Sequence, residues 1–140
     1  MALQVDHERL KWLLLLYKKA HRSFLIHGTF GIGKSHTVIA TGKEEAERLG
    51  RKFAIWQDLT RDEKKEIYEN CKKYFVVLDI RMSENSDGSD LKGIPYEISE
   101  LPVIEWKSTL WACLLEKQGS DGILFLDELN LATPMVINSC

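Results

Sequence analysis

Residues Gly28–Ser35 read GTFGIGKS, which satisfies the pattern GxxxxGK[ST] between an apolar segment and a helical one. The glycines let successive backbone N–H groups point at phosphate oxygens, and the following helix presents the positive end of its dipole to the same anion. The pattern predicts a phosphate-binding loop, and a glycine turn that matches by chance is the less favoured alternative. The residues expected to line this loop and contact its ligand are Gly28, Thr29, Phe30, Gly31, Ile32, Gly33, Lys34, Ser35 and His36.

The segments on either side of the loop fit this role. Residues 22–27, RSFLIH, form a short apolar run that ends at the first glycine, as a buried parallel strand would. Residues 34–49 have helical composition and stop at Gly50, a common C-terminal signal. Within the loop, Lys34 would reach the β- and γ-phosphates of a nucleotide, and the Ser35 hydroxyl would ligate the Mg²⁺ that bridges them. The sequence therefore predicts strand, loop and helix in succession.

The rest of the chain alternates between helical and extended patterns. Helices are predicted at residues 6–20 with Asp6 as the cap, at about 60–72 with Thr60 and Glu63 as a capping box, and at 106–117, and extended segments at 53–56, 74–80 and 122–127. The run YFVVLDI at 74–80 is the strongest strand and is expected at the centre of a sheet. Polar residues 83–90 predict a surface loop. This alternation predicts an α/β fold with a mainly parallel sheet.

The stretch GILFLDELN at residues 122–130 places two carboxylates directly after an apolar strand. Asp127 lies at the carboxyl end of that strand, where open α/β sheets bind their ligands, and would hold the Mg²⁺ through water. Glu128 is then placed to orient and deprotonate the water that attacks the γ-phosphate of ATP. The alternative is a strand that ends in two solvated charges. Together with the loop, the pair predicts ATP hydrolysis and makes a P-loop kinase less favoured.

Composition limits the kinds of partner. The 140 residues suffice for one ordinary domain, and a net charge of −2 gives no global footprint for nucleic acid. The apolar run at residues 13–16 is far too short for a membrane span. The three cysteines, Cys71, Cys113 and Cys140, are widely spaced and form no CxxC pair, which favours a reducing, cytoplasmic setting over a disulfide or zinc framework.

Four segments, FLIHGTFGIGKSHT, YFVVLDIRMSE, SDLKGIP and GILFLDELNLATP, occur in the order and rough spacing seen in MoxR-like ATPases. From residue 23 onward the chain resembles this branch of the AAA+ superfamily, which is also similar to the dynein-related group. The resemblance implies a three-layer αβα P-loop fold that binds ATP and Mg²⁺. It also implies a remodelling ATPase of the chaperone type that usually forms a homo-oligomeric ring and acts on a client protein.

Two further positions gain an interpretation from this resemblance. Asn130 is similar in position to an asparagine that lies near the γ-phosphate; alternatively, Asn130 caps a helix that starts at Leu131. The region around Tyr96 resembles the start of an insertion that faces partners or the ring pore. A structured connection with a solvated surface is the favoured alternative for that region.

The chain stops at Cys140, before the sensor strand, the arginine finger and the helical lid that follow the acidic pair in the resembled family. We therefore expect a single incomplete AAA+ domain over residues 1–140, with an N-terminal helix at 1–21 and a P-loop core at 22–140. Without the sensor strand, the sheet would have a gap between residues 22–27 and 122–127. The favoured expectation is a fragment of a longer gene product; the alternatives are a chain completed by a partner and direct pairing of the two strands. The alternative function is a nucleotide-binding module without efficient hydrolysis of its own.

Overall fold

The computed structural model describes residues 4–29, 31–84, 91, 93–97, 103–117, 119, 121–132 and 134. In these ranges the α-helices are α1 (His7–Lys19), α2 (Lys34–Arg48), α3 (Arg61–Glu69) and α5 (Leu110–Glu116). The strands are β1 (Lys52–Ile55), β2 (Tyr74–Arg81), β3 (Ile94–Glu97), β4 (Ile104–Lys107) and β5 (Gly122–Asp127). Short 3₁₀ helices lie at η1 (Trp56–Asp58), η2 (Cys71–Lys73), η3 (Met82–Glu84) and η4 (Leu129–Leu131). Most of the predicted polar loop, residues 85–90, lies outside the described residues.

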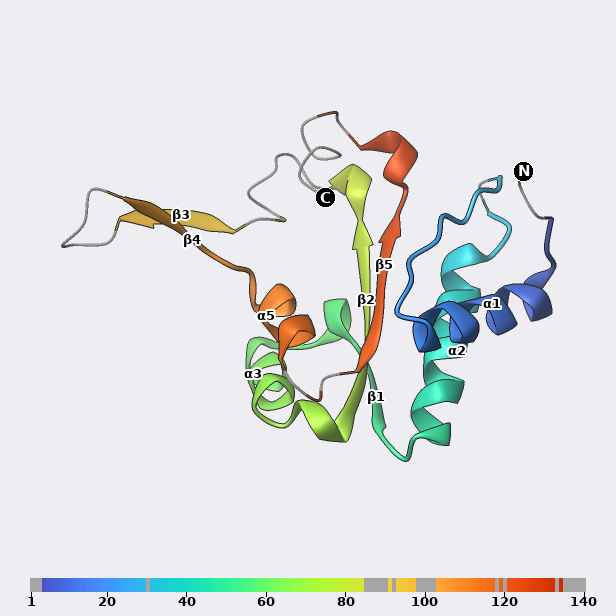
Figure 1. Ribbon diagram of the computed structural model, residues 1–140, viewed down its shortest axis with the longest axis horizontal. Coiled ribbons are helices and arrows are strands. Elements are labelled where there is room, and N and C mark those ends of the chain that lie inside the picture. Colours follow the sequence, from blue (N-terminus) through green and yellow to red (C-terminus); the bar gives the residue numbers. More distant parts are fainter. Residues whose placement is uncertain are drawn as a thin grey trace.

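The main sheet holds three parallel strands in the order β1-β2-β5 (Figure 1). β2 lies in the middle, as its apolar sequence predicts, and its residues 75–78 are all buried. A parallel strand needs cover on both faces, because helical crossovers place a helix layer on each side. The predicted class, α/β with a mainly parallel sheet, is therefore confirmed.

Helices cover the two faces of this sheet and form two separate apolar cores (Figure 1). The core under α1 and α2 contains Leu10, Leu14, Val38, Ala46, Phe75 and Val77. The core under α3 and α5 contains Ala54, Trp56, Ile67, Cys71, Val76, Leu78 and Leu114. Successive residues of β2 alternate between the two cores, since side chains of a strand point to opposite faces in turn. The same alternation directs residues 123, 125 and 127 of β5 toward α2.

Gly42 lets α2 lie directly on β2. This residue is buried in the middle of the helix, and a Cβ at this position would come within 2.5 Å of Val77 Cγ2. Such an approach is shorter than any ordinary carbon contact, so a larger residue would push the helix and the strand apart. The absence of a side chain thus fixes how far α2 stands from the sheet.

The predicted helix ends are confirmed at three places. Asp6 caps α1 by accepting a hydrogen bond from the Arg9 N–H at 2.8 Å. Thr60 and Glu63 form the predicted capping box at the start of α3. Gly50 follows α2 with a φ of 65°, the left-handed conformation that glycine adopts without strain. No helix in the described ranges is long and apolar enough to cross a membrane.

The strand predicted at residues 22–27 is not formed. The segment is irregular, and among the described residues β5 pairs only with β2. Two of its apolar side chains, Phe24 and Ile26, still pack on the core under α1 and α2, whereas Leu25 between them is 75% exposed. Phe24 also contacts Tyr17, with ring centroids 4.7 Å apart. Side-chain packing, rather than strand pairing, therefore holds this segment, and the direct pairing of 22–27 with β5 is not seen.

The helix predicted at residues 106–117 starts late, because its first part belongs to a β-hairpin. Residues Ile104–Lys107 form β4, which pairs antiparallel with β3, and α5 begins only after Thr109. The hairpin extends away from the main sheet (Figure 1). Ile94, Ile104 and Trp106 are 69%, 65% and 55% exposed. Tyr96 lies on this hairpin and donates a hydrogen bond to Glu105 at 2.8 Å. The region is a structured element, and its contact with a partner stays a prediction.

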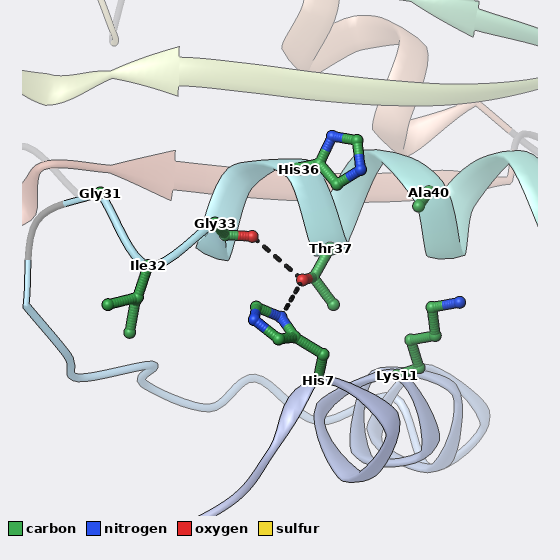
Figure 2. A pocket seen from close by; sticks show the side chains of 8 residues that line it. All are labelled: His7, Lys11, Gly31, Ile32, Gly33, His36, Thr37 and Ala40. Atoms are coloured by element: carbon green, nitrogen blue, oxygen red, sulfur yellow. Dashed lines mark hydrogen bonds between the residues drawn. The ribbon is translucent and has the colours of Figure 1, made fainter.

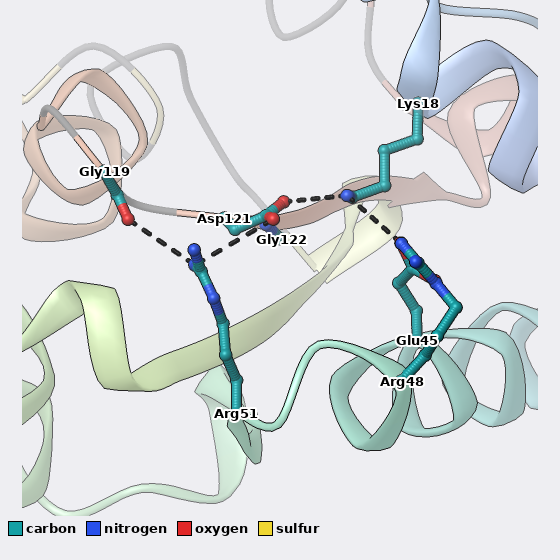
Figure 3. Close-up of polar contacts among 7 residues, drawn as sticks. All are labelled: Lys18, Glu45, Arg48, Arg51, Gly119, Asp121 and Gly122. Carbon is teal, nitrogen blue, oxygen red and sulfur yellow. Dashed lines mark hydrogen bonds and ion pairs between the residues drawn. The ribbon is translucent and has the colours of Figure 1, made fainter.

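A polar network ties α1 and α2 to the amino end of β5 (Figure 3). Lys18 lies 3.4 Å from Glu45 and 3.0 Å from Asp121, and Arg51 lies 3.9 Å from Asp121. Arg48 donates to both oxygens of Glu45, at 2.6 and 2.8 Å, and the Glu45 side chain is 5% exposed. The hydrogen bonds from Arg48, followed by the charge of Lys18, hold the pKa of Glu45 below its ordinary value despite burial. We call these five residues the basal clamp.

Candidate functional site

The glycine-rich loop adopts the backbone that its sequence predicts. Gly31 and Gly33 have φ angles of 81° and 80°, in the left-handed region where a side chain would be strained. At Gly28 a Cβ would come within 2.6 Å of Ile32 Cδ1, the end of an exposed side chain that can move aside, so the structure sets no strict need for glycine there. Gly33 is the N-cap of α2 and supplies no side-chain hydrogen bond. The first N–H groups of α2 are therefore not capped by that residue, and they point out of the helix toward the loop.

Lys34 folds back over this loop. Its ammonium donates hydrogen bonds to the carbonyl oxygens of Gly28 and Thr29, each at 3.0 Å. Ammonium groups form shorter and stronger bonds with phosphate than with neutral carbonyls, so an anion in the loop can replace these contacts. The geometry thus keeps a positive charge beside the uncapped end of α2. Thr29 and His36 are exposed, and Phe30 lies outside the described residues.

Ser35 and Asp127 meet although they lie 92 positions apart in the chain. The Ser35 hydroxyl, in the first turn of α2, donates to Asp127 Oδ2 at 2.6 Å. The other oxygen of Asp127 accepts a hydrogen bond from the Glu128 N–H at 2.8 Å. The parallel sheet explains this meeting, because α2 packs on the face of β5 toward which Asp127 points. The two residues predicted to hold Mg²⁺ are thus brought into contact.

The chemistry of this pair fits a magnesium ion. Mg²⁺ prefers hard oxygen ligands and keeps several waters, so it usually takes only one or two protein side chains plus phosphate oxygens. A hydroxyl and a carboxylate at hydrogen-bond distance supply such oxygens. Within the described residues no group of three or more His, Cys, Asp or Glu side chains could hold a metal by itself. A site of this kind would therefore be completed by a phosphate ligand.

Glu128, which follows β5, is held by a contact at the carboxyl end of β2. It has a φ of 54°, which is unusual for a residue with a side chain, and it begins the turn η4. The Ser83 hydroxyl in η3 donates a hydrogen bond to the Glu128 carboxylate. Sequence reasoning missed Ser83. The available signal was its place just after β2, since neighbouring parallel strands bring their carboxyl ends together.

Asn130 is not brought into contact with the loop by any hydrogen bond in the described part of the chain. Asn130 is exposed and lies inside η4, whose N-cap position is Glu128. The interpretation of Asn130 as a helix N-cap is therefore wrong. Its predicted place near a γ-phosphate stays a prediction.

A cavity of about 410 Å³ opens beside the loop, between α1 and the start of α2 (Figure 2). It is lined by His7, Lys11, Gly31, Ile32, Gly33, His36, Thr37 and Ala40. The α1 residues His7 and Lys11 were absent from the predicted site. Periodicity indicated only that α1 packs inward, and no motif in α1 marks these two positions as ligand contacts. Their proximity to the loop is a product of the tertiary fold.

No protein-family model matches this sequence, and neither a curated protein nor a solved structure shows detectable similarity to it. The loop, the carboxylates and the cavity are therefore the grounds on which a function can be argued.

Proposed function

We propose that this chain binds ATP with Mg²⁺ and forms the hydrolytic centre of an ATPase. The observation that carries the proposal is the 2.6 Å contact between Ser35, at the end of the glycine-rich loop, and Asp127, at the end of β5. A chance match to the loop pattern gives no reason for a magnesium-type carboxylate to lie against its serine. The contact brings together the glycine-rich loop and the acidic pair, which lie in separate segments of the sequence.

The phosphates of ATP would lie across the loop. Backbone N–H groups of residues 31–35 and the positive end of α2 would face the phosphate oxygens. Lys34 would exchange the carbonyls of Gly28 and Thr29 for the β- and γ-phosphates. When bound, Mg²⁺ would neutralise the charge that develops on the phosphates during transfer. Ser35 would contribute a hydroxyl ligand, and Asp127 would hold the ion through water.

Glu128 would serve as the general base. Its carboxylate would accept a proton from the water whose oxygen bonds to the γ-phosphorus, while the bond from that phosphorus to the β–γ bridging oxygen breaks and ADP leaves with the electron pair. Ser83 would set the direction of this carboxylate through the hydroxyl hydrogen bond. Asn130 is assigned to the neighbourhood of the γ-phosphate by its resemblance alone.

We further infer a MoxR-like AAA+ protein that acts, in a homo-oligomeric ring, on a client protein. The order of the four sequence segments supports this assignment, and the exposed β3–β4 hairpin is a suitable element for meeting a partner. The α/β class agrees with it at a coarser level, while the irregular segment at residues 22–29 departs from the strand expected in a P-loop core.

A binding module without efficient turnover is the second candidate. The hydrogen bond from Ser83 favours it, because Glu128 is engaged at the end of β2 and would have to be redirected to act on water at the loop. Arginine fingers from neighbouring subunits raise rates in related phosphoryl chemistry by about 10³-fold or more. Transfer of the phosphate to a second substrate, as in a kinase, is the least favoured outcome because of Glu128.

Calorimetry with Mg²⁺–ATP tests the binding site. Lys34→Ala should weaken binding about tenfold to a hundredfold, because charge-assisted hydrogen bonds to phosphate are lost. Lys43→Ala is the matched control, since Lys43 is an exposed lysine of the same helix away from the loop. Removal of Mg²⁺ with a chelator should weaken binding to the unsubstituted chain as well. Equal affinities of the Lys34→Ala and Lys43→Ala variants would refute the assignment of the loop.

A further inference from the structure

The β3–β4 hairpin lacks the packing layer that a hairpin normally needs. Both strands are exposed over most of their length, and none of their residues belongs to the two apolar cores of the described chain. A two-stranded hairpin is at best marginally stable alone in water, and packing against a helix is one way to stabilise it. The hairpin therefore has room for a further layer.

One face of the hairpin is suited to such a layer. Residues paired across two antiparallel strands share a face, and so do every second pair along the ladder. The pairs Pro95–Trp106 and Glu97–Ile104 therefore point to the same side. All four residues are exposed, and Glu97 is the charged one among them. We call these four residues the hairpin face.

α1 has an apolar face that points away from its own core. Leu10 and Leu14 are buried, whereas Trp12, Leu15 and Leu16 are 62%, 36% and 43% exposed. Trp12 precedes the two leucines by three and four residues, which is the spacing of neighbours on a helix surface. We call these three exposed residues the helix face, and it is an apolar surface on the kind of element that the hairpin lacks.

The two faces are complementary in charge and in length. Exposed Arg9 and Lys19 lie about one turn beyond the two ends of the helix face, and Glu8 is the acidic residue of α1, so this face is net positive. Contact between two helix faces or two hairpin faces would bring like charges together, whereas a hairpin face on a helix face pairs Glu97 with cations. The 13 residues of α1 span about 20 Å, enough for strands of four residues, about 13 Å.

The hairpin and α1 lie at opposite ends of the molecule (Figure 1). We propose that the hairpin face of one copy of this chain packs on the helix face of the next copy, in a head-to-tail contact. A contact of this kind repeats from copy to copy and closes into a ring where the rotation allows. The inference rests on the homo-oligomer of the proposed function, to which it assigns a contact, and not on the chemistry at the loop. Few large side chains take part, so the contact belongs to the small and weak class of interfaces.

Sedimentation of the full chain over a range of concentrations tests the inference. The unsubstituted chain should form species larger than a dimer as the concentration rises, because each copy has both faces. Trp12→Ser and Trp106→Ser should each weaken association at least about tenfold, since tryptophans often supply much of the binding energy of an interface. Ile94→Ser removes an exposed apolar side chain from the opposite face of the hairpin and is the matched control, with association unchanged.

A mixture of the two serine variants tests the direction of the contact. Trp12→Ser keeps the hairpin face and Trp106→Ser keeps the helix face, so equal amounts should form a one-to-one dimer that grows no further. This dimer would also show that both variants fold. Arg9→Glu combined with Lys19→Glu reverses the charge beside the helix face while keeping Trp12, and it should weaken association several-fold.

Four results would contradict the inference. Association that both serine variants and the charge reversal retain would assign the contact to other surfaces and leave the homo-oligomer standing. Loss in each folded variant without a dimer in the mixture would indicate contact between like faces. A monomeric chain that floats with phosphatidylserine vesicles, and no longer does so as Trp12→Ser, would make the helix face a lipid-binding surface. A chain that is monomeric at every concentration would overturn this contact and the proposed homo-oligomer together, while Mg²⁺–ATP binding would still be decided by Lys34→Ala.

Discussion

The two ends of β5 are both held by side chains from other elements, but by different kinds of contact. At the amino end, Asp121 lies in the basal clamp among charged partners, 3.0 Å from Lys18 and 3.9 Å from Arg51 (Figure 3). At the carboxyl end, Asp127 is held by the Ser35 hydroxyl and a backbone N–H. Cations beside carboxylates stabilise the fold itself, whereas neutral donors leave a carboxylate ready to face a metal ion. Under the proposed function, the amino end of the strand serves stability and the carboxyl end serves binding.

Glu128→Gln is expected to have the largest effect on that functional end. The amide keeps the shape of the side chain but cannot accept the proton of the attacking water, and a general base contributes about 10²–10⁴-fold to rate. In a preparation that hydrolyses ATP, steady-state phosphate release should fall by this factor while ATP affinity is retained. Glu66→Gln, an exposed glutamate of α3 far from the loop in sequence, is the control. Undiminished release would remove Glu128 from the role of base.

Asp127→Asn and Asp121→Asn compare the two ends directly. The amide at 127 should weaken Mg²⁺–ATP binding about tenfold to a hundredfold, as expected when a carboxylate that orients metal-bound water is lost. Its melting temperature should stay near that of the unsubstituted chain. The amide at 121 should have the opposite profile, lowering stability by about 1 kcal/mol because Lys18 and Arg51 lose a half-buried partner.

Calorimetry and thermal unfolding of the same two variants measure both quantities. If Asp121→Asn weakens binding more than Asp127→Asn does, or if Asp127→Asn is the less stable variant, the division of β5 into a stability end and a binding end is wrong.

Acidification should weaken the basal clamp and lower the stability of the fold, by less than the effects expected for the variants above. The pKa of Glu45 is lower in the folded chain than its ordinary value of 4.5. Such a group contributes stability that is fully present above 4.5 and is lost as the pH falls through the lower, folded-state pKa. Glu45→Gln should therefore reduce the loss of stability between neutral and acidic pH. Denaturant unfolding at several pH values measures this effect. If the unfolding free energy of Glu45→Gln falls with pH below 4.5 as steeply as that of the unsubstituted chain, the prediction is wrong.

Local signals in the sequence predicted the parts of the fold that depend on neighbours in the chain. The Thr60–Glu63 box, the Asp6 cap and the glycine after α2 were all found, because each depends on residues a few positions apart. The central place of β2 followed from its uninterrupted apolar run, which only burial on both faces can satisfy.

The errors occurred where distant segments decide the outcome. Residues 22–27 have an apolar pattern, but a strand also needs a partner edge, and the segment instead packs Phe24 and Ile26 on the core. Trp106 and Lys107 have helical neighbours in sequence, yet they pair with β3. In the site, the loop and Asp127 could be predicted from motifs. Ser83 could have been found from its place just after β2, whereas His7 could not, because tertiary packing alone brings α1 beside the loop.

Because Gly42 has no side chain, α2 can lie close to β2, and this close packing also sets the position of Ser35. The Ser35 hydroxyl lies seven residues before Gly42 on α2, about 10 Å along the helix axis at 1.5 Å per residue. Any residue larger than glycine would lift the middle of this helix off Val77 and carry Ser35 away from Asp127. The alignment of Ser35 with Asp127 therefore depends on a position that lies outside both the loop and the acidic pair. A survey of substitutions confined to the loop and the acidic pair would overlook it.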